Sequence, residues 1–78
     1  MKGWETLDRL EAGEAGIVAG LLTEGEMRRR FLDLGLVEDT RVECIGKSPG
    51  GDPAAYLIRG AVIAIRKKNC ESILIRRL

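Results

Sequence analysis

The chain has 78 residues, of which 45% are hydrophobic and 32% are charged. This length suits one small domain, 1–78, built around a single hydrophobic core. The longest apolar runs have five residues, as at 61–65, whereas a membrane-spanning helix needs about 20. No apolar segment follows Lys2 in the manner of a signal peptide. We therefore expect a cytoplasmic protein without membrane insertion of its own, peripheral to a membrane only through a partner.

The net charge of +1 is too small for strong non-specific attraction to nucleic acid. Charge is nevertheless unevenly divided, because residues 1–26 hold six acids and two bases while residues 27–78 hold six acids and eleven bases. Small barrels bind single strands through aromatic stacking, and this chain has only three aromatic residues, Trp4, Phe31 and Tyr56. We expect no nucleic-acid partner and interpret the basic residues as a solvated face.

Short strand-like segments, separated by glycine and proline, make up most of the chain. A helical turn at Leu7 and Leu10 precedes a first strand at 15–22, in which alternation places Ile17 inward and the glycines indicate a bend or bulge. Four further strands are predicted at 40–46, 54–59, 61–66 and 73–77. Residues 48–53 form a loop of turn-forming residues, and 67–72 leave room for one helical turn. These elements predict a mainly β fold, a small antiparallel barrel of five strands.

One helix is expected near 24–34, between the first and second strands. Thr23 followed by Glu26 matches a capping box. Apolar residues then recur at helical spacing, and Met27, Phe31 and Leu34 form one stripe that we expect to plug the barrel.

The end of this helix is marked by glycine. Gly35 stands where a left-handed residue closes a helix, and Leu36 can fold back on Phe31. The predicted core collects the inward residues of the helix and strands: Ile17, Met27, Phe31, Leu34, Val42, Leu57, Ile63, Ile65 and Ile75.

The residues that could carry chemistry are few. The chain has two cysteines, Cys44 and Cys70, and no histidine, whereas a structural zinc site needs four nitrogen or sulfur ligands, usually in close pairs. We interpret both cysteines as small core hydrophobes, with Cys44 inward, and keep them only as candidate metal ligands. Without histidine or a phosphate-binding loop motif, the sequence predicts no enzyme activity and no cofactor.

The order and spacing of several motifs resemble the FeoA family, small cytoplasmic accessory proteins of bacterial ferrous iron uptake. The motifs are Arg-Arg-Arg-Phe-Leu-Asp-Leu-Gly-Leu at 28–36, Thr40, Ser48-Pro49, Gly51-Asp52-Pro53, Arg59-Gly60, Ala64-Ile65-Arg66, Ile73 and Ile75. The chain departs from the family pattern at Asp39, where a glycine is usual, and at both cysteines. Aspartate tolerates left-handed geometry better than most residues.

The resemblance implies an SH3-like barrel with one helix inserted after the first strand. It also implies docking on FeoB, the membrane ferrous iron transporter with a cytosolic GTPase domain, and regulation of its GTPase activity or assembly. From their expected positions at the helix surface and barrel end, we predict partner contacts by Arg28, Arg29, Leu36 and Arg66. Weak self-association stays open.

Two alternatives to this function remain. One is a stand-alone regulatory module related to the C-terminal domain of iron-dependent repressors, which the resemblance implies has the same fold. The other is a metal carrier that uses Cys44 and Cys70 with a carboxylate.

Overall fold

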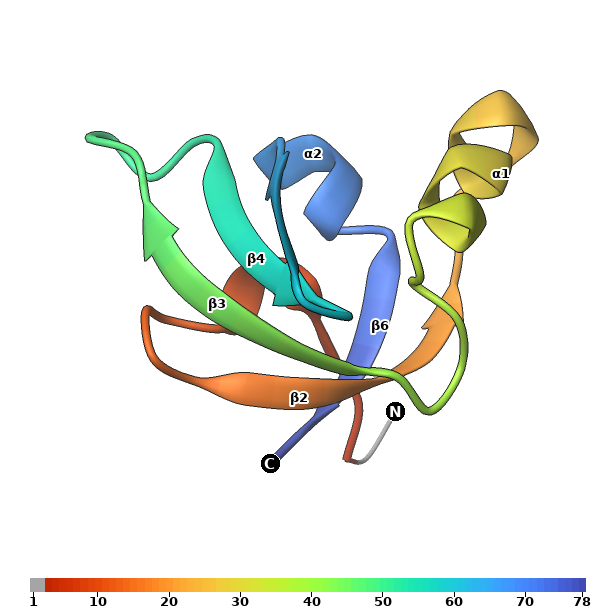
Figure 1. Cartoon of the computed structure of the whole chain (residues 1–78), viewed down its shortest axis with the longest axis horizontal. Coiled ribbons are helices and arrows are strands. Elements are labelled where there is room, and N and C mark those ends of the chain that lie inside the picture. Colours follow the sequence, from red (N-terminus) through yellow and green to blue (C-terminus); the bar gives the residue numbers. More distant parts are fainter. Residues whose placement is uncertain (1–2) are drawn as a thin grey trace.

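A computed structural model describes residues 3–78, and these form a strongly curled antiparallel sheet with two short helices (Figure 1). The mainly β prediction is confirmed. The elements in chain order are strand β1 (Glu5–Thr6), the 3₁₀ turn η1 (Leu7–Arg9), β2 (Ala15–Leu21), helix α1 (Gly25–Asp33), β3 (Arg41–Lys47), β4 (Ala54–Ile58), β5 (Ala61–Ile65), helix α2 (Lys67–Cys70) and β6 (Ile73–Arg77).

The sheet has six strands in the order β1-β6-β2-β3-β4-β5, one more than predicted. The additional strand, β1, has only two residues and pairs with β6 at Glu5↔Ile75 and Thr6↔Leu74. So short a strand carries no alternation that sequence analysis can detect. Backbone pairing does not join β1 to β5, so in residues 3–78 these two strands are edges of a curled sheet and the expected closure is incomplete.

Two bulges bend the long strands. The pairing register shifts between Val18 and Gly20 where β2 meets β6, and between Cys44 and Gly46 where β3 meets β4. A bulge inserts one residue and so reverses which side chains face inward. As a result Val18 is buried and Leu21 packs against the core, whereas Ile17 is only half-buried. The glycine bend was predicted correctly, but the inward face of this strand was not.

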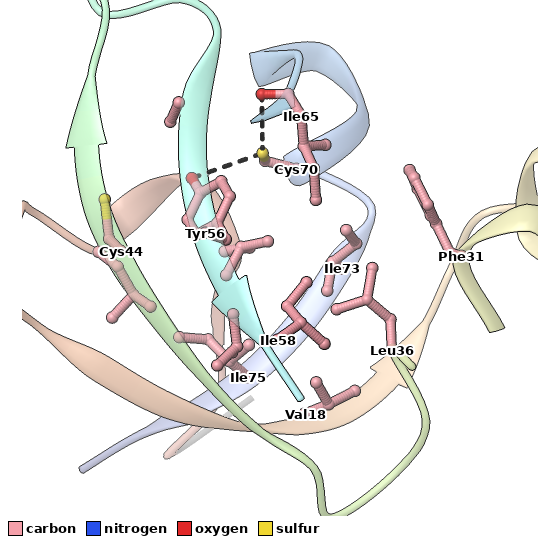
Figure 2. Packing of buried hydrophobic residues seen from close by; sticks show 14 residues of the cluster. Val18, Phe31, Leu36, Cys44, Tyr56, Ile58, Ile65, Cys70, Ile73 and Ile75 are labelled. Carbon is pink, nitrogen blue, oxygen red and sulfur yellow. Dashed lines mark hydrogen bonds between the residues drawn. The ribbon is translucent and has the colours of Figure 1, made fainter. Parts of the chain in front are cut away.

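One continuous core fills the curl of the sheet and receives residues from every long strand (Figure 2). Of the predicted core, Phe31, Val42, Ile65 and Ile75 are buried, and Leu34 and Ile63 pack against them. Three predictions are wrong: Ile17 and Leu57 are half-buried, and Met27 is 38% exposed. The core residues are Leu7, Leu10, Val18, Phe31, Leu36, Val42, Cys44, Ala54, Tyr56, Ile58, Ile65, Cys70, Ile73 and Ile75.

Helix α1 starts one residue later than the capping-box pattern requires. Glu24 occupies the N-cap position and makes no side-chain cap hydrogen bond, while the Thr23 hydroxyl oxygen is buried without a partner in residues 3–78. Because Thr23 precedes the N-cap, its hydroxyl is out of register with the first free N–H groups of the helix. The predicted capping box is therefore wrong.

The C-terminal end of α1 forms as predicted. Gly35 has φ +106°, the Gly35 N–H donates to the Leu32 carbonyl at 3.0 Å, and the Leu36 N–H donates to the Phe31 carbonyl at 2.9 Å. These two hydrogen bonds define a Schellman motif, which closes the helix and turns the chain back into the core. Leu36 and Phe31 both lie in that core (Figure 2).

Left-handed residues also shape two turns. Asp39 adopts φ +74° before β3, consistent with its place where the family usually has glycine. Arg59 and Gly60, with φ +51° and +82°, form the two-residue connection between β4 and β5. Two positive φ values are the signature of a type I′ hairpin turn, which matches the natural twist of paired strands.

In residues 3–78, neither helix contains an apolar stretch long enough to cross a bilayer.

Candidate functional site

The outer surface of α1 is the most exposed part of the regular structure. Figure 1 shows the helix standing away from the curled sheet rather than filling it, so the predicted plug is not present. Of its nine residues only Phe31 is buried. A helix this short is marginally stable without tertiary contacts. Phe31 and the Schellman motif therefore anchor the helix while most of its surface faces solvent.

The predicted arginines on α1 are exposed but differ in their contacts. Arg28 donates from Nη1 to the backbone carbonyl of Leu21 at 3.1 Å, which ties the helix to the end of β2. Arg29 and Arg30 make no hydrogen bond or ion pair through their side chains within residues 3–78. Two guanidinium groups thus remain available to carboxylates of another molecule.

The other two predicted contact residues lie elsewhere. Leu36 is fully buried below the Schellman motif, so its side chain is not presented to a partner, and that expectation is corrected. The reason is that the hydrophobic residue after a C-terminal glycine folds back on the helix. Arg66 is exposed, but it is the N-cap residue of α2, and no hydrogen bond or ion pair in residues 3–78 links it to α1.

Sequence analysis missed the apolar residues that α1 exposes. Met27 and Leu32 are 38% and 36% exposed, and Leu22, just before the helix, is 62% exposed. The helical stripe that contains Phe31 predicts a core position for Met27, and the observed exposure contradicts it. The exposure of apolar side chains beside unpaired arginines is typical of a protein contact surface. The available signal was that Leu32 lies to one side of the stripe formed by Met27, Phe31 and Leu34, so one short helix could not bury all four side chains.

The two cysteines are buried around Tyr56 (Figure 2). Cys44 on β3 pairs in register with Tyr56 on β4, and the Sγ atom of Cys70 lies 3.5 Å from the Tyr56 hydroxyl oxygen and 3.8 Å from the carbonyl oxygen of Ile65. Burial raises the pKa of the Cys70 thiol to about 11 and also raises the pKa of Cys44 and of Tyr56. At neutral pH these groups are therefore protonated and unreactive.

The candidate metal ligands do not assemble into a cluster. Within residues 3–78 no group of three or more histidine, cysteine, aspartate or glutamate side chains lies close enough to hold a metal ion. Both thiols occupy the apolar core instead, as predicted from the inward position of Cys44.

An open cleft of about 680 Å³ lies at the end of the sheet formed by η1, the 48–53 loop and α2. Its walls carry charges of both signs, including Asp8, Glu11, Lys47 and Lys67. Lys47 donates to a carboxylate oxygen of Glu11 and to the backbone carbonyl of Asp8, both at 3.4 Å. Lys47 and Glu11 therefore neutralise each other within the protein, whereas the contact with Asp8 involves only its backbone.

Arg77 closes one side of this cleft. Its guanidinium donates to both carboxylate oxygens of Glu5, at 3.1 and 2.8 Å, to the Glu14 carboxylate, and to the carbonyl of Arg9 at 3.1 Å. The Arg77 hydrogen bond lowers the pKa of Glu5. The pKa of Glu14 is lowered first by the backbone N–H of Glu11 and then by Arg77. The Arg77 guanidinium connects β6 to β1 and to the start of β2, so it stabilises the place where the first and last strands meet.

Asp52 has a structural role at the other side of the cleft. Its carboxylate accepts a hydrogen bond from the backbone N–H of Lys67 at 3.0 Å, at the start of α2. A carboxylate at this position satisfies a free N–H group of the helix and complements its dipole. Within the Gly51-Asp52-Pro53 motif, which supports the family resemblance, Asp52 thus has a role in folding.

The family model of the FeoA domain matches residues 5–77. The chain belongs to the FeoA family. The FeoA-like protein from Clostridium acetobutylicum is 33% identical, with a TM-score of 0.88 over 100% of this chain and 91% of that one. No curated protein matches.

Two more distant solved structures share the fold alone. FeoA from Stenotrophomonas maltophilia, described as a prokaryotic SH3-domain protein complexed with zinc, is 23% identical, with a TM-score of 0.82 over 91% of this chain and 88% of that one. A manganese-dependent transcriptional repressor is 20% identical, with a TM-score of 0.87 over 100% of this chain and 38% of that one. The small SH3-like fold predicted from the sequence is therefore confirmed.

Proposed function

We propose that this protein is a non-enzymatic adaptor that docks on the cytosolic domain of a FeoB-type ferrous iron transporter and regulates its GTPase activity or assembly. Membership of the FeoA family supports a role in iron transport. The proposal places the protein in the cytoplasm, at the membrane only through this partner. Its most reactive residue types, the two cysteines, are buried and protonated, which favours binding over catalysis.

The observation that carries the proposal is the exposure of α1. Eight of its nine residues lie outside the core, and its fold depends on Phe31 and the terminal glycine rather than on its outer surface. The outer surface is therefore free to vary for binding without loss of the fold. Arg29 and Arg30 offer two unpaired positive charges beside the exposed side chain of Leu32. The complementary surface of a partner would carry carboxylates around an apolar centre.

Charge reversal tests this assignment. The variant Arg29→Glu/Arg30→Glu should bind the purified cytosolic domain of the FeoB transporter of the same organism at least about tenfold more weakly, because two exposed positive charges are replaced by negative ones that repel the partner's carboxylates. Titration calorimetry measures the affinity, and thermal melting checks that the fold is retained. Exposed substitutions change stability little, by about 0.5 kcal/mol.

A matched control separates local contacts from net charge. Arg9 is exposed on η1 and makes no side-chain ion pair within residues 3–78, so Arg9→Glu changes the charge by the same amount as Arg29→Glu. Only Arg29→Glu should weaken binding. Equal affinities for the wild type and the double variant would remove α1 from the interface.

Neither alternative gains support from the structure. The likeness to a manganese-dependent repressor is one of fold, and fold does not determine function. The metal-carrier reading would need Cys44 and Cys70 to share a site, but both side chains are packed into the core.

A further inference from the structure

The strand β5 is an exposed sheet edge that lacks the usual protection against pairing with another chain. β4 covers one side of β5, and within residues 3–78 no strand pairs with the other side. The five residues are Ala-Val-Ile-Ala-Ile, with no charge and no proline, and the pairing with β4 contains no register shift. Proteins normally protect such edges with lysine, proline or bulges. The opposite edge, β1, is only two residues long.

The hairpin register shows which backbone groups face outward. In a two-residue turn the flanking pair, here Ile58 and Ala61, exchanges the cross-strand hydrogen bonds. Alternate residues therefore direct their N–H and C=O groups toward β4, while Val62 and Ala64 direct theirs to the free side. No hydrogen bond in residues 3–78 occupies those outward groups.

The side chains next to this edge form an apolar strip on the outer face of the sheet. Val62 is 63% exposed, and Ile45 on β3 is 46% exposed. On the same part of the sheet a shallow groove of about 270 Å³ extends from Ala64 on β5 across Ala55 to Gly46 and the start of the 48–53 loop. An added strand at the β5 edge could lay one side chain into this groove.

The charged residues around β5 indicate which kind of strand could pair with its free edge. Residues 59–68 contain four bases and no acid. All four are exposed, and none makes an ion pair within residues 3–78; Arg66 directly follows the strand, and Arg59 precedes it by two residues. The bases are Arg59, Arg66, Lys67 and Lys68.

This charge disfavours a second copy of the same chain. If two β5 strands paired antiparallel about Ile63, Arg59 of each copy would face Lys67 of the other. Like charges directly opposite destabilise a strand pair. A strand with acidic residues at both ends would instead meet opposite charge.

We propose that the free edge of β5 binds an extended segment of a partner protein by strand addition, and that this segment has apolar residues at its centre and acidic residues at both ends. Backbone hydrogen bonds from Val62 and Ala64 supply the pairing, and the flanking arginines and lysines select the acidic ends. The surface is separate from the one proposed on α1, so it gives the protein a second point of attachment.

The test uses the whole protein and a synthetic acidic probe peptide, Glu-Asp-Val-Thr-Val-Thr-Val-Asp-Glu, with a matched peptide in which lysine replaces each acid. The acidic peptide should bind at least about tenfold more tightly than the lysine peptide at about 0.15 M salt. The NMR amide signals of Val62 and Ala64 should shift most. Equal affinity for both peptides, or shifts confined to α1, would overturn the proposal.

Two variants test the backbone pairing. Val62→Pro removes an outward N–H that β4 does not use and should abolish binding, whereas Val62→Thr should retain it. If Val62→Pro does not fold, an acidic peptide N-methylated at alternate residues tests the other half of the pairing without altering the protein, because it removes N–H groups that the peptide would donate to the outward carbonyls of Val62 and Ala64. Undiminished binding of that peptide would contradict strand addition.

Two controls separate this surface from the alternatives. Arg29→Glu/Arg30→Glu should bind the acidic peptide as the wild type does, so failure of the α1 proposal leaves this result intact. Loss of peptide binding in that variant would overturn the assignment to β5. Sedimentation that showed dimers dissociated by Val62→Pro would replace the acidic partner with a second copy.

Discussion

The curled sheet and α1 are stabilised in different ways. Thirteen of the fourteen core residues belong to the sheet strands, α2 and the segments that join them, and α1 supplies only Phe31. The sheet is held by many buried contacts, whereas α1 is held by one aromatic side chain, a Schellman motif and the hydrogen bond from Arg28 to Leu21. The two regions therefore differ in what they contribute. The sheet supplies most of the stability of the fold, and α1 supplies exposed side chains.

The strongest test of this difference is a cavity in the core. Ile75 on β6 is fully buried and pairs with Val18 of β2. Ile75→Ala should lower the free energy of unfolding by about 2–5 kcal/mol, a large share of the roughly 5–15 kcal/mol available to a small domain. Urea denaturation followed by circular dichroism measures the change.

Two controls show whether the loss is specific to the core. Ile45→Ala removes the same atoms from a side chain that is 46% exposed, and Met27→Ala shortens an exposed side chain of α1. Each should change the free energy of unfolding by only about 0.5 kcal/mol. A loss at Met27 as large as that at Ile75 would mean that α1 packs as part of the core.

A substitution where α1 meets the sheet should lower the free energy of unfolding by a smaller amount. Gly35 has φ +106°, and a Cβ atom there would lie 2.9 Å from Cδ of Arg59, in the β4–β5 turn. Gly35→Ala should therefore cost about 1–2 kcal/mol for the left-handed backbone and displace the Arg59 side chain. The matched change Gly20→Ala has no positive φ and no atom within 4 Å of the new Cβ.

A double variant separates the two causes of the stability lost in Gly35→Ala, which are backbone strain and the contact with Arg59. In Gly35→Ala/Arg59→Ala the side-chain contact is absent and only the backbone strain remains, so unfolding should require more urea than for Gly35→Ala alone. If Arg59→Ala brings no recovery, the contact between α1 and the β4–β5 turn contributes nothing to the strain.

The sequence predicted the fold well where turn chemistry is local. Glycine and proline marked the strand ends, and Gly35 correctly ended α1. The prediction failed where a distant contact decides the outcome. In β2 both faces are apolar, so alternation alone could not choose Val18 over Ile17, and the bulge that settles the choice depends on pairing with β6.

The sequence also did not predict that the hydroxyl group of Tyr56 is buried. Tyr56 is fully buried because Cys70, fourteen residues away, supplies a partner for its hydroxyl. Leu57 beside it has the more apolar side chain and was predicted inward instead. For the candidate site, helical spacing correctly predicted that Arg28 and Arg29 are exposed, and their role in binding stays a prediction. The exposure of Met27 and the burial of Leu36 depend on how the helix sits on the sheet.

The smallest effect concerns the polar junction that holds the chain ends to the sheet. Arg77 contacts Glu5 and Glu14, and the pKa of each carboxyl lies below its ordinary value near 4.5. A carboxyl with a lowered pKa in the folded state stabilises the protein above the pKa of the unfolded state, and this contribution is lost as pH falls through the lower, folded value. Stability should therefore decline below about pH 4.5 in the wild type.

Arg77→Gln should flatten this acid-side decline, because the carboxyls then lose the cation that favours their charged form. The neighbouring change Arg76→Gln removes a single ion pair to Asp39 at 3.6 Å and touches neither glutamate, so it should leave the decline unchanged. Urea midpoints between about pH 3 and 7 measure both variants. If Arg77→Gln keeps the wild-type profile, the junction adds nothing to the acid stability of the sheet, and the stabilising region reduces to its apolar core.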